Sequence, residues 1–479
     1  MCRETLELYL KLLEEAKKSP DPYHLAKLVA SEGLCPYLFF RNIDKLSNLE
    51  VIVCTYPYLT KLYDLLMDDV EKIPSKGIVC ILDEAHNIEG TIFTTLASIN
   101  YKILNGALVE LGKYVSKHSE ELYNNCLRII EALFTIVNLC RKEKLEDEKI
   151  IPIDVLNNLL PLSDIDYYIT TLEEACKIII ESYRRLIYAR KMVDKEPCLI
   201  YVLEFFQSLR YGKDIVLVWT NDGIDVRSLL IDCEYTFQDF NHVLMMSGTL
   251  PPEDYCQKVW HIPKRSMTYI NMSRTAVGKV EKYLDLSVTT RYTERSPEMI
   301  HRYVEKLYKI FNMSRKVVLA VAPSYDMVQA FRLVIDNKYP DLASKLIVET
   351  EKTDIHSVEK RAKALQHCMI LAVAGGKLCE GVEITENGQS LIDAVAICGI
   401  PYNPPTEYNQ VFENYIIQKC KLDQMYVKNV RAWMLIRQAL GRATRSERDY
   451  CRWFLLDYRF REKFWIDNLL GNDFKIINL

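Results

Sequence analysis

Two adjacent carboxylates follow a short apolar run in the first fifth of the chain. Ile78–Leu82 is apolar, and Asp83, Glu84 and His86 come directly after it. In an open α/β sheet, ligands gather at the carboxyl ends of the strands. Nucleotide hydrolysis needs one carboxylate for Mg²⁺ and another that polarises the attacking water. The pattern predicts these roles for Asp83 and Glu84, with His86 coupling the site to its neighbours; an acidic turn without function is the alternative.

A second candidate site lies near the C-terminus, where Arg442 and Arg445 are three residues apart. On a helix this spacing places both side chains on one face. Such arginines can reach the γ-phosphate of a nucleotide and neutralise charge that develops during phosphoryl transfer. Gln438 precedes them on the same side, and Gly441 is expected to allow close backbone packing. A solvated basic helix is the alternative, because further arginines surround the segment.

Two sets of apolar, β-branched runs are expected to position these residues as buried parallel strands. The first set comprises Val51–Cys54, Ile78–Leu82, Ile215–Val218 and Val243–Met246, and the second comprises Val317–Val321, Leu346–Val348, Met369–Val373, Ala394–Ile397 and Trp453–Leu456. Between the sets, Ser296 as N-cap and Pro297 as first helical residue predict the start of a helix. Two sets of strands alternating with helices predict two parallel α/β domains.

The segment from about residue 95 to 210 has a different pattern. Apolar residues recur at helical spacing, beginning with Ile103, Ala107, Leu111 and Val115, and predict a helical insertion in the first domain. We therefore expect residues 1–48 as a mainly helical unit, 49–95 plus 211–262 as the first α/β domain, 96–210 as the helical insertion and 263–479 as the second α/β domain.

Composition limits the function classes. The formal net charge is -4 and the hydrophobic fraction 49%, so nucleic acid would have to bind in local grooves rather than through bulk positive charge. We find no run of about 20 apolar residues of the kind that spans a membrane. Many of the 15 cysteines, such as Cys54, Cys80 and Cys398, fall in apolar runs, which indicates buried thiols in a reducing, intracellular compartment, cytoplasmic or nucleoid-associated in a prokaryote.

The segment Asp83-Glu-Ala-His-Asn-Ile88 resembles the second motif of the XPD-like helicases, which include the bacterial DinG group. Further segments resemble the later motifs in family order: Ser247–Leu250 the third, Val317–Tyr325 the fourth, Gly376–Gly381 the fifth and Gln438–Arg445 the sixth. The resemblance implies an α/β fold of two RecA-like parallel-sheet motor domains, with a helical arch insertion and a remnant iron–sulfur helical domain. It implies nucleotide contacts by Ser247, Thr249, Gly376, Glu380, Gly381, Gln438 and Gly441.

The resemblance also implies a [4Fe–4S] cluster held by four cysteines. Cys2 resembles the third ligand and Cys35, followed by Pro-Tyr, the fourth; thiolates are the usual ligands of such clusters. The other two ligands and the phosphate-binding loop would lie upstream of Met1. Each of the four Gly-Lys pairs lacks the Ser or Thr that such a loop requires. We therefore expect a truncated gene model, with little ATP hydrolysis and no stable cluster in this chain as written.

The family's DNA path suggests further contacts. Thr55–Tyr58 is a candidate channel lining, and Arg184, Arg185 and Arg190 are candidate phosphate contacts on the arch, although ordinary loop and helix-surface positions explain them equally well. Gly375 stands where the family often has arginine, and Glu383 where it often has aspartate.

The resulting hypothesis is an ATP- and Mg²⁺-dependent DNA helicase that translocates five-prime to three-prime along single-stranded DNA. It would act on forked DNA in repair, as a monomer, with repair proteins as candidate partners and no membrane association. The alternative is a non-catalytic DNA-binding scaffold descended from such a helicase. We disfavour a nuclease because the sequence shows no other carboxylate cluster with metal-site spacing.

Overall fold

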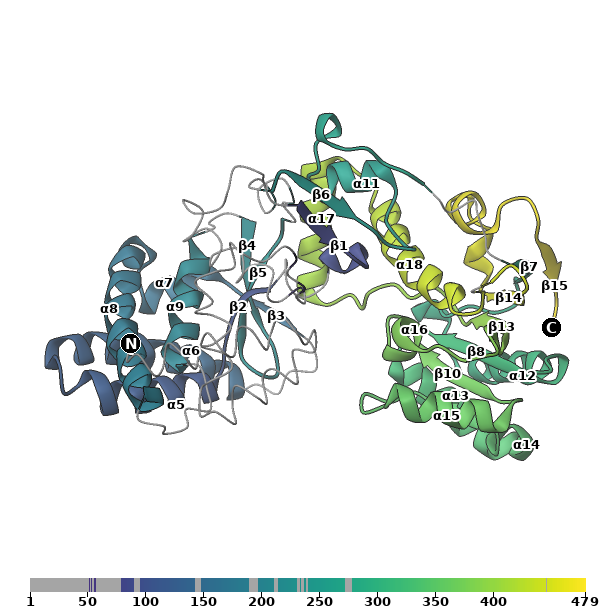
Figure 1. Cartoon of the computed structure of the whole chain (residues 1–479), viewed down its shortest axis with the longest axis horizontal. Coiled ribbons are helices and arrows are strands. Elements are labelled where there is room, and N and C mark those ends of the chain that lie inside the picture. Colours follow the sequence, from purple (N-terminus) through teal and green to yellow (C-terminus); the bar gives the residue numbers. More distant parts are fainter. Residues whose placement is uncertain are drawn as a thin grey trace.

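The computed structural model describes residues 51, 53, 56, 79–89, 95–142, 148–188, 197–210, 214–230, 233, 237, 240–271, 278–444 and 446–479. The expected helical unit 1–48, Cys2, Cys35, Arg190 and Arg445 lie outside these residues. Figure 1 shows a helical part at one end, the larger sheet at the other, and the short strands β1 and β6 between them.

The larger sheet is parallel and has seven strands in the order β15-β7-β14-β13-β8-β10-β9. Its strands are β7 Lys279–Asp285, β8 Val317–Ala322, β9 Leu346–Val348, β10 Met369–Val373, β13 Ile392–Ile397, β14 Tyr450–Leu456 and β15 Lys475–Ile477. All five runs predicted for the second domain are confirmed as strands. The sequence prediction missed β7 and β15, because lysine and glutamate interrupt the apolar pattern of these outer strands.

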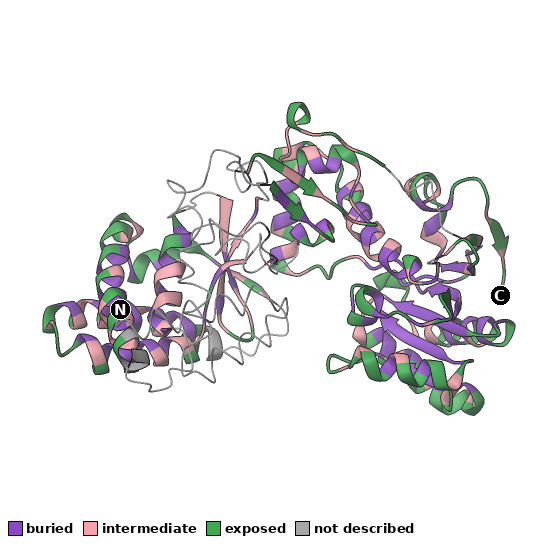
Figure 2. Cartoon of the chain, viewed as in Figure 1, coloured by how far each residue is buried: buried purple, intermediate pink, exposed green. Residues whose placement is uncertain are grey.

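Both faces of this sheet are covered by helices. Along β8 the buried side chains alternate between two cores, with Leu319 in one and Ala320 in the other, as the two-residue period of a strand requires. Helices α12 and α13 contribute to the Ala320 side, and α15, α16 and α18 to the Leu319 side. Figure 2 shows these central strands almost entirely buried.

The helices of this domain are α12 Pro297–Met313, α13 Tyr325–Lys338, α14 Pro340–Ala343, α15 Ile355–Leu365, α16 Lys377–Gly381, α17 Glu407–Cys420, α18 Gln424–Gly441 and α19 Lys463–Trp465, and a short hairpin joins β11 Thr385–Glu386 to β12 Gln389–Ser390. The predicted start of α12 is confirmed, since the side chain of Ser296 accepts a hydrogen bond from Met299 N and Pro297 is the first helical residue.

The first α/β domain expected from the sequence contains a two-stranded parallel sheet, β1 Val79–Leu82 paired with β6 His242–Met245. Both were predicted. One face packs into a core that includes Leu82 and residues of α11 Glu253–Lys258, α17 and α18. Of the run Val51–Cys54, the described Val51 and Val53 are exposed and belong to no strand, contrary to the predicted buried strand.

The insertion is helical, as predicted. It contains α5 Tyr101–Glu110, the π-helical turn η4 Leu111–Val115, α6 Glu120–Lys142, α7 Ile153–Leu159, α8 Ile165–Tyr188 and α9 Cys198–Leu209. These helices share one core with a four-stranded antiparallel sheet, which consists of β2 Thr95–Ile99, β5 Ile224–Ser228, β4 Ile215–Trp219 and β3 Lys149–Ile151 in that order.

The position of β4 corrects the sequence analysis. Ile215–Val218 does form a strand, but it pairs antiparallel with β5 and β3 rather than joining a parallel motor sheet. The physical reason is the turn Asn221-Asp222-Gly223, closed by a hydrogen bond from Thr220 N to Gly223 O of 2.8 Å. Asp-Gly between two apolar runs is a local hairpin signal, and it could have predicted this pairing.

Candidate functional site

The acidic turn follows β1 directly, at the carboxyl end of the two-stranded sheet. The parallel ladder continues past the strands, because Met246 N donates to Leu82 O at 2.9 Å and Ala85 N donates to Met246 O at 2.9 Å. These bonds bring the Ser247 turn alongside Asp83 and Glu84. Both carboxylate residues are exposed, so they face solvent at the edge where ligands of α/β sheets bind.

Glu84 adopts a left-handed backbone conformation, with φ of 49°. Non-glycine residues rarely occupy this region, and where they do, the strain commonly marks a functional site. Glu84 N donates to Asp83 Oδ1 at 3.0 Å. The turn therefore holds its two carboxylates in a fixed mutual arrangement.

Tyr56 supports the same turn. Its hydroxyl donates to Asp83 O at 2.9 Å, and burial together with the nearby Asp83 carboxylate raises the pKa of Tyr56 to about 12. Tyr56 was a candidate for the DNA channel; its hydroxyl instead binds the main chain of the acidic turn. The remaining residues of Thr55–Tyr58 lie outside the described part of the chain.

A chain of hydrogen bonds runs from Glu84 to the second domain. Ser247 Oγ donates to Glu84 Oε2 at 3.2 Å, and His86 Nδ1 lies 2.7 Å from Ser247 Oγ. The other ring nitrogen of His86 is hydrogen-bonded by Gln438 Nε2 on α18. Ser247 Oγ also accepts from Thr249 N at 3.0 Å. Five predicted site residues therefore meet in one network, although they lie up to 354 positions apart in the sequence.

The orientation of the Gln438 amide decides the tautomer of His86. With Gln438 Nε2 toward the ring, Nε2 of His86 accepts and Nδ1–H donates to Ser247. Ser247 can then donate to the Glu84 carboxylate. Burial lowers the pKa of His86, and Arg442 acts in the same direction against the opposing effect of Glu84. The lowered pKa favours the neutral imidazole, which offers one donor and one acceptor to its two neighbours. Among the described residues Gln438 Oε1 has no hydrogen-bond partner.

Helix α18 carries Gln438 and belongs to two cores. Its beginning, including Val430, packs with the first sheet, whereas Ile436 and Leu440 pack beneath the larger one. Between these parts, Arg431 Nε donates to Glu89 Oε2 at 2.9 Å and to the hydroxyl of Tyr255 at 3.2 Å. Sequence analysis missed Arg431 and Glu89, since their pairing depends on the tertiary packing of segments 342 residues apart.

Arg442, at the end of α18, lies within electrostatic range of the acidic residues. Burial raises the pKa of Glu380, Arg442 opposes this shift, and Glu84 adds to it. The fifth and sixth motifs and the acidic turn thus face one region. Of the two arginines predicted as fingers, only Arg442 can be placed, because Arg445 lies outside the described residues.

The loop that leads to Glu380 is held by a buried carboxylate that the sequence analysis did not select. Glu349 Oε2 accepts from Val373 N at 2.9 Å and Oε1 from Leu378 N at 3.2 Å. A Cβ added to Gly376 would lie 2.6 Å from Glu349 Oε1. Gly375 has φ of +72°, a conformation that glycine adopts without strain and arginine does not. The departure from the family pattern at 375 therefore has a backbone explanation.

The expectation of close backbone packing at Gly441 is wrong. Among the described residues, no atom outside the helix backbone lies within 4 Å of a Cβ added there. At Gly381, by contrast, an added Cβ would lie 2.7 Å from Ile355 Cδ1. Asp457 and Arg459, which follow β14, bind each other at 2.7 Å and the loop at Thr290, which follows β7.

The donor set around Asp83 fits Mg²⁺ but no multi-ligand metal site. Among the described residues, no group of three or more His, Cys, Asp and Glu side chains is arranged to hold a metal ion. Mg²⁺ bound with nucleotide typically uses one or two carboxylates together with phosphate oxygens and water. The exposed Asp83 carboxylate at this edge, with Glu84 beside it, matches that chemistry.

The described Gly-Lys pairs serve other structural purposes. Gly112 and Lys113 lie in the π-helical turn η4, Gly278 and Lys279 begin β7, and Lys377 Nζ donates to Glu351 O at 2.8 Å. On the arch, Arg185 is exposed and lies 3.8 Å from Glu181, an ordinary ion pair on a helix surface. No helix in the described ranges has the length and hydrophobicity to cross a membrane.

Two family models match the chain: DEAD_2 at residues 5–103 and the helicase C-terminal domain at 307–472. Over 474 residues it is 30% identical to the ATP-dependent DNA helicase XPD of Sulfolobus acidocaldarius, covering 95% of this chain and 78% of that protein. It is 22% identical to the ATP-dependent DNA helicase CHL1 of Saccharomyces cerevisiae, covering 98% of this chain and 60% of CHL1.

Two solved structures share the fold of this chain. A structure titled XPD_Helicase superposes with a TM-score of 0.65 at 28% identity, covering 96% of this chain and 78% of that one. The structure of S. tokodaii Xpd4 gives 0.63 at 22% identity, covering 90% and 83%. The chain is similar in sequence to an XPD helicase over most of both chains, matches two helicase family models and shares the architecture of two RecA-like domains. It therefore belongs to the XPD-type family of superfamily 2 helicases.

Proposed function

We propose that this protein is an ATP-dependent DNA helicase that moves five-prime to three-prime along single-stranded DNA and separates forked duplexes in DNA repair. The observation that carries the proposal is the hydrogen-bonded chain Glu84–Ser247–His86–Gln438. It joins the predicted hydrolytic carboxylate to the helix that bears the predicted arginine finger. Such a link lets the state of the nucleotide alter how the two motor domains contact each other.

In the proposed mechanism, Asp83 holds Mg²⁺, and Glu84 orients the attacking water and accepts its proton. Arg442, together with Arg445, stabilises charge on the γ-phosphate. Ser247 and His86 convey the change at Glu84 to Gln438. The remaining proposed nucleotide contacts are Thr249, Gly376, Glu380, Gly381 and Gly441, of which Gly441 contributes by its exposed position rather than by close packing.

We further propose that this chain by itself turns ATP over slowly, because none of its Gly-Lys pairs is followed by Ser or Thr. Cys2 and Cys35 are proposed as two of the four ligands of a [4Fe–4S] cluster. We propose a monomer in an intracellular compartment, with other repair proteins as partners. The proposed domains are 1–48, 49–95 plus 211–262, 96–210 and 263–479, except that β2, β4 and β5 belong to the sheet of the arch unit.

The test measures the affinity for a fluorescent single-stranded oligonucleotide with and without ATP and Mg²⁺, which does not depend on fast turnover. A motor should show an ATP-dependent change in affinity, and Arg442→Ala should abolish it. Glu84→Gln should keep that change while reducing single-turnover hydrolysis by about 10²-fold or more. Glu253→Gln, an exposed carboxylate on α11, is the matched control.

The same measurement tests the alternative of a DNA-binding scaffold. A scaffold would bind the oligonucleotide equally well with and without ATP, and neither Arg442→Ala nor Glu84→Gln would matter. That result would refute the motor proposal. Direction is tested separately, by comparing the unwinding of forks that carry only a five-prime or only a three-prime tail.

A further inference from the structure

A pocket of about 370 Å³ lies at the amino ends of the central strands of the larger sheet. The carboxyl ends, with Gly376 and Asp457, lie at the opposite edge, about 20 Å away for strands of six to seven residues. The pocket is therefore separate from the proposed nucleotide site. It is lined by Met313, Arg315, Lys316, Gln389, Ser390, Asp393, Arg448, Asp449, Tyr450 and Arg452.

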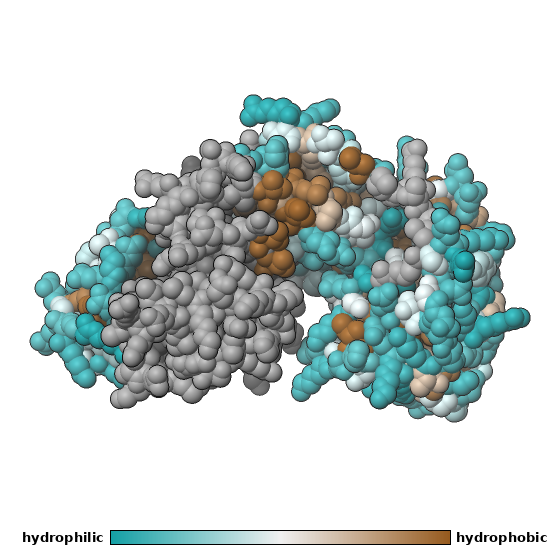
Figure 3. Space-filling view, in the orientation of Figure 1, coloured by the Kyte–Doolittle hydropathy of each residue, from teal (hydrophilic) through white to brown (hydrophobic). Residues whose placement is uncertain are grey.

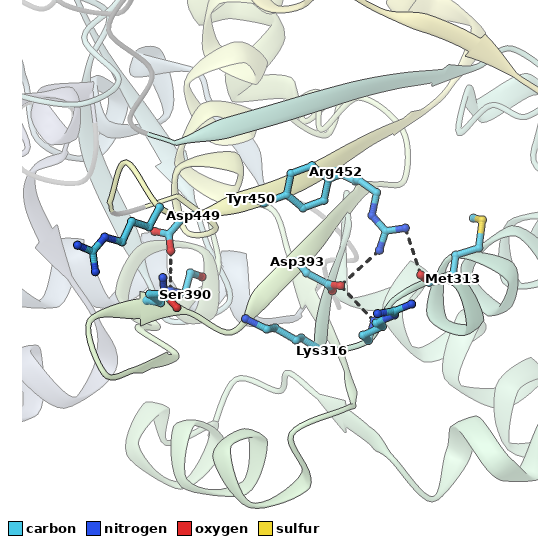
Figure 4. A pocket seen from close by; sticks show the side chains of 10 residues that line it. Met313, Lys316, Ser390, Asp393, Asp449, Tyr450 and Arg452 are labelled. Atoms are coloured by element: carbon cyan, nitrogen blue, oxygen red, sulfur yellow. Dashed lines mark hydrogen bonds and ion pairs between the residues drawn. The ribbon is translucent and has the colours of Figure 1, made fainter.

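The acidic side chains of the pocket accept hydrogen bonds from its walls, although Asp393 Oδ1 has no partner among the described residues. Asp393 Oδ2 accepts from Arg452 Nη2 at 3.3 Å and from Arg315 N at 3.1 Å. Arg452 also donates to Met313 O at 3.2 Å. Asp449 is buried and accepts from Ser390 N at 3.0 Å. Figure 4 shows Asp393 and Arg452 facing each other across the pocket and Asp449 beside Ser390.

Three further cationic side chains line the pocket. Arg315, Lys316 and Arg448 are exposed, and among the described residues none of their side chains forms an ion pair. With Arg452 the pocket has four cationic side chains against two carboxylates. A third carboxylate, Glu281 on β7, is the register partner of Arg452 and accepts hydrogen bonds from the hydroxyls of Tyr450 and, at 2.6 Å, of Tyr283. It leaves one positive charge in excess. The excess positive charge therefore faces solvent.

An aromatic ring stands beside these cations. Tyr450 is 42% exposed, and within the described ranges its ring is not paired with another aromatic ring. Exposed aromatic rings next to cations are the combination with which proteins bind single-stranded nucleic acids, by stacking bases and neutralising phosphates. An acidic peptide would use the cations but would gain little from the exposed ring.

We propose that this pocket binds a phosphate group and the adjoining base of single-stranded nucleic acid, outside the motor cleft. Arg315, Lys316 and Arg448 neutralise the phosphate backbone, Tyr450 stacks on the base, and the Asp393–Arg452 pair holds the wall of the pocket. The inference rests on the proposed function only in that single-stranded DNA is the substrate. It adds a second anchoring point on the second motor domain.

The test compares two triple variants by fluorescence anisotropy with an oligonucleotide long enough to reach both edges of the sheet. The pocket variant carries Arg315→Gln, Lys316→Gln and Arg448→Gln. The control carries Lys338→Gln, Lys360→Gln and Lys363→Gln, three exposed lysines on α13 and α15 of the same domain. The pocket variant should bind roughly tenfold more weakly, and the slope of log affinity against log salt should fall by about 0.7 for each phosphate that is no longer neutralised.

Equal affinity and equal salt slope in the two triple variants would overturn the inference. So would a pocket variant that keeps its DNA affinity and loses binding of an acidic peptide. If the triple variant unfolds, Arg448→Gln alone replaces it, with Lys363→Gln as its control.

A photo-cross-linking oligonucleotide separates this inference from the motor proposal. A cross-link mapped to the peptide containing Tyr450 supports the pocket even where ATP has no effect on DNA binding. An ATP effect with no cross-link at Tyr450, and no loss in the triple variant, leaves the motor standing and removes the pocket.

Discussion

The two parallel sheets of this protein differ in how they are covered. The larger sheet has helices on both faces, and β8 and β10 are buried along their whole length. Among the described residues, the two-stranded sheet is covered on one face only. On its other face Val79 is 58%, Ile81 61% and Leu244 50% exposed, and Figure 3 shows hydrophobic surface in this part of the molecule.

The difference in helix cover indicates which elements hold the proposed site in place. A parallel sheet is normally covered on both faces, and the larger sheet supplies its own cover. The smaller sheet, among the described residues, shares its buried core with α11 and the segment that follows it, and also with α17 and α18, which follow strands of the larger sheet in the chain. The acidic turn is therefore held in part by helices of the second domain, and the comparison can be tested by weakening each interaction in turn.

The largest effect is expected at the buried ion pair that joins the two regions. Arg431→Met leaves the Glu89 carboxylate buried without its cation, which should cost about 3–5 kcal/mol in the free energy of unfolding of the unit around β1. Chemical denaturation measures the loss. The double variant Glu89→Gln, Arg431→Met should recover most of it. Additive losses in the double variant would show that the pair does not couple the two regions.

A smaller loss is expected in the core of the larger sheet. Leu319 is fully buried on β8, and Leu319→Ala should destabilise the second domain by about 3 kcal/mol through weaker apolar packing and a residual cavity. Ile81→Ala, on the exposed face of β1, is the matched control and should change stability by less than about 0.5 kcal/mol. Comparable losses at both positions would mean that the exposed face of β1 is covered in solution.

The glycines of the fifth and sixth motifs should respond in opposite directions. Gly375 has φ of +72°, so Gly375→Ala should destabilise the second domain by about 1 kcal/mol. Gly441 ends α18 in open space, and Gly441→Ala should be neutral or stabilise by up to about 1 kcal/mol. Thermal unfolding distinguishes them. If Gly441→Ala lost as much thermal stability as Gly375→Ala, close backbone packing at Gly441 would be supported after all.

The smallest effect is a pH dependence that arises from His86. Because its pKa is lowered in the folded protein, the unfolded chain binds more protons once the pH falls below about 6.5. The contribution of neutral His86 is complete above that pH and is lost as the pH falls toward the lowered pKa. In His86→Asn this part of the pH dependence of stability should disappear. An unchanged slope between wild type and variant would remove His86 as its source.

Local patterns predicted much of the second domain. Its five central strands are continuous apolar runs, and Ser296-Pro297 specifies a helix start through capping alone. The outer strands β7 and β15 escaped prediction because solvent on one side permits charged residues there. The strand Ile215–Trp219 was recognised, but its partner was wrong, since an apolar run has the same appearance in a parallel and an antiparallel sheet.

The sequence by itself determined which side chains stand after which strands, and motif order was sufficient to indicate the helicase family. Only the tertiary structure decided that Gln438 binds His86, that Arg431 binds Glu89, and that Glu349 holds the loop at Gly376. The physical reason is the distance along the sequence over which each kind of interaction acts. Strand periods, helix caps and turns depend on residues a few positions apart, whereas these interactions join residues that only the packing of whole elements brings within hydrogen-bonding distance.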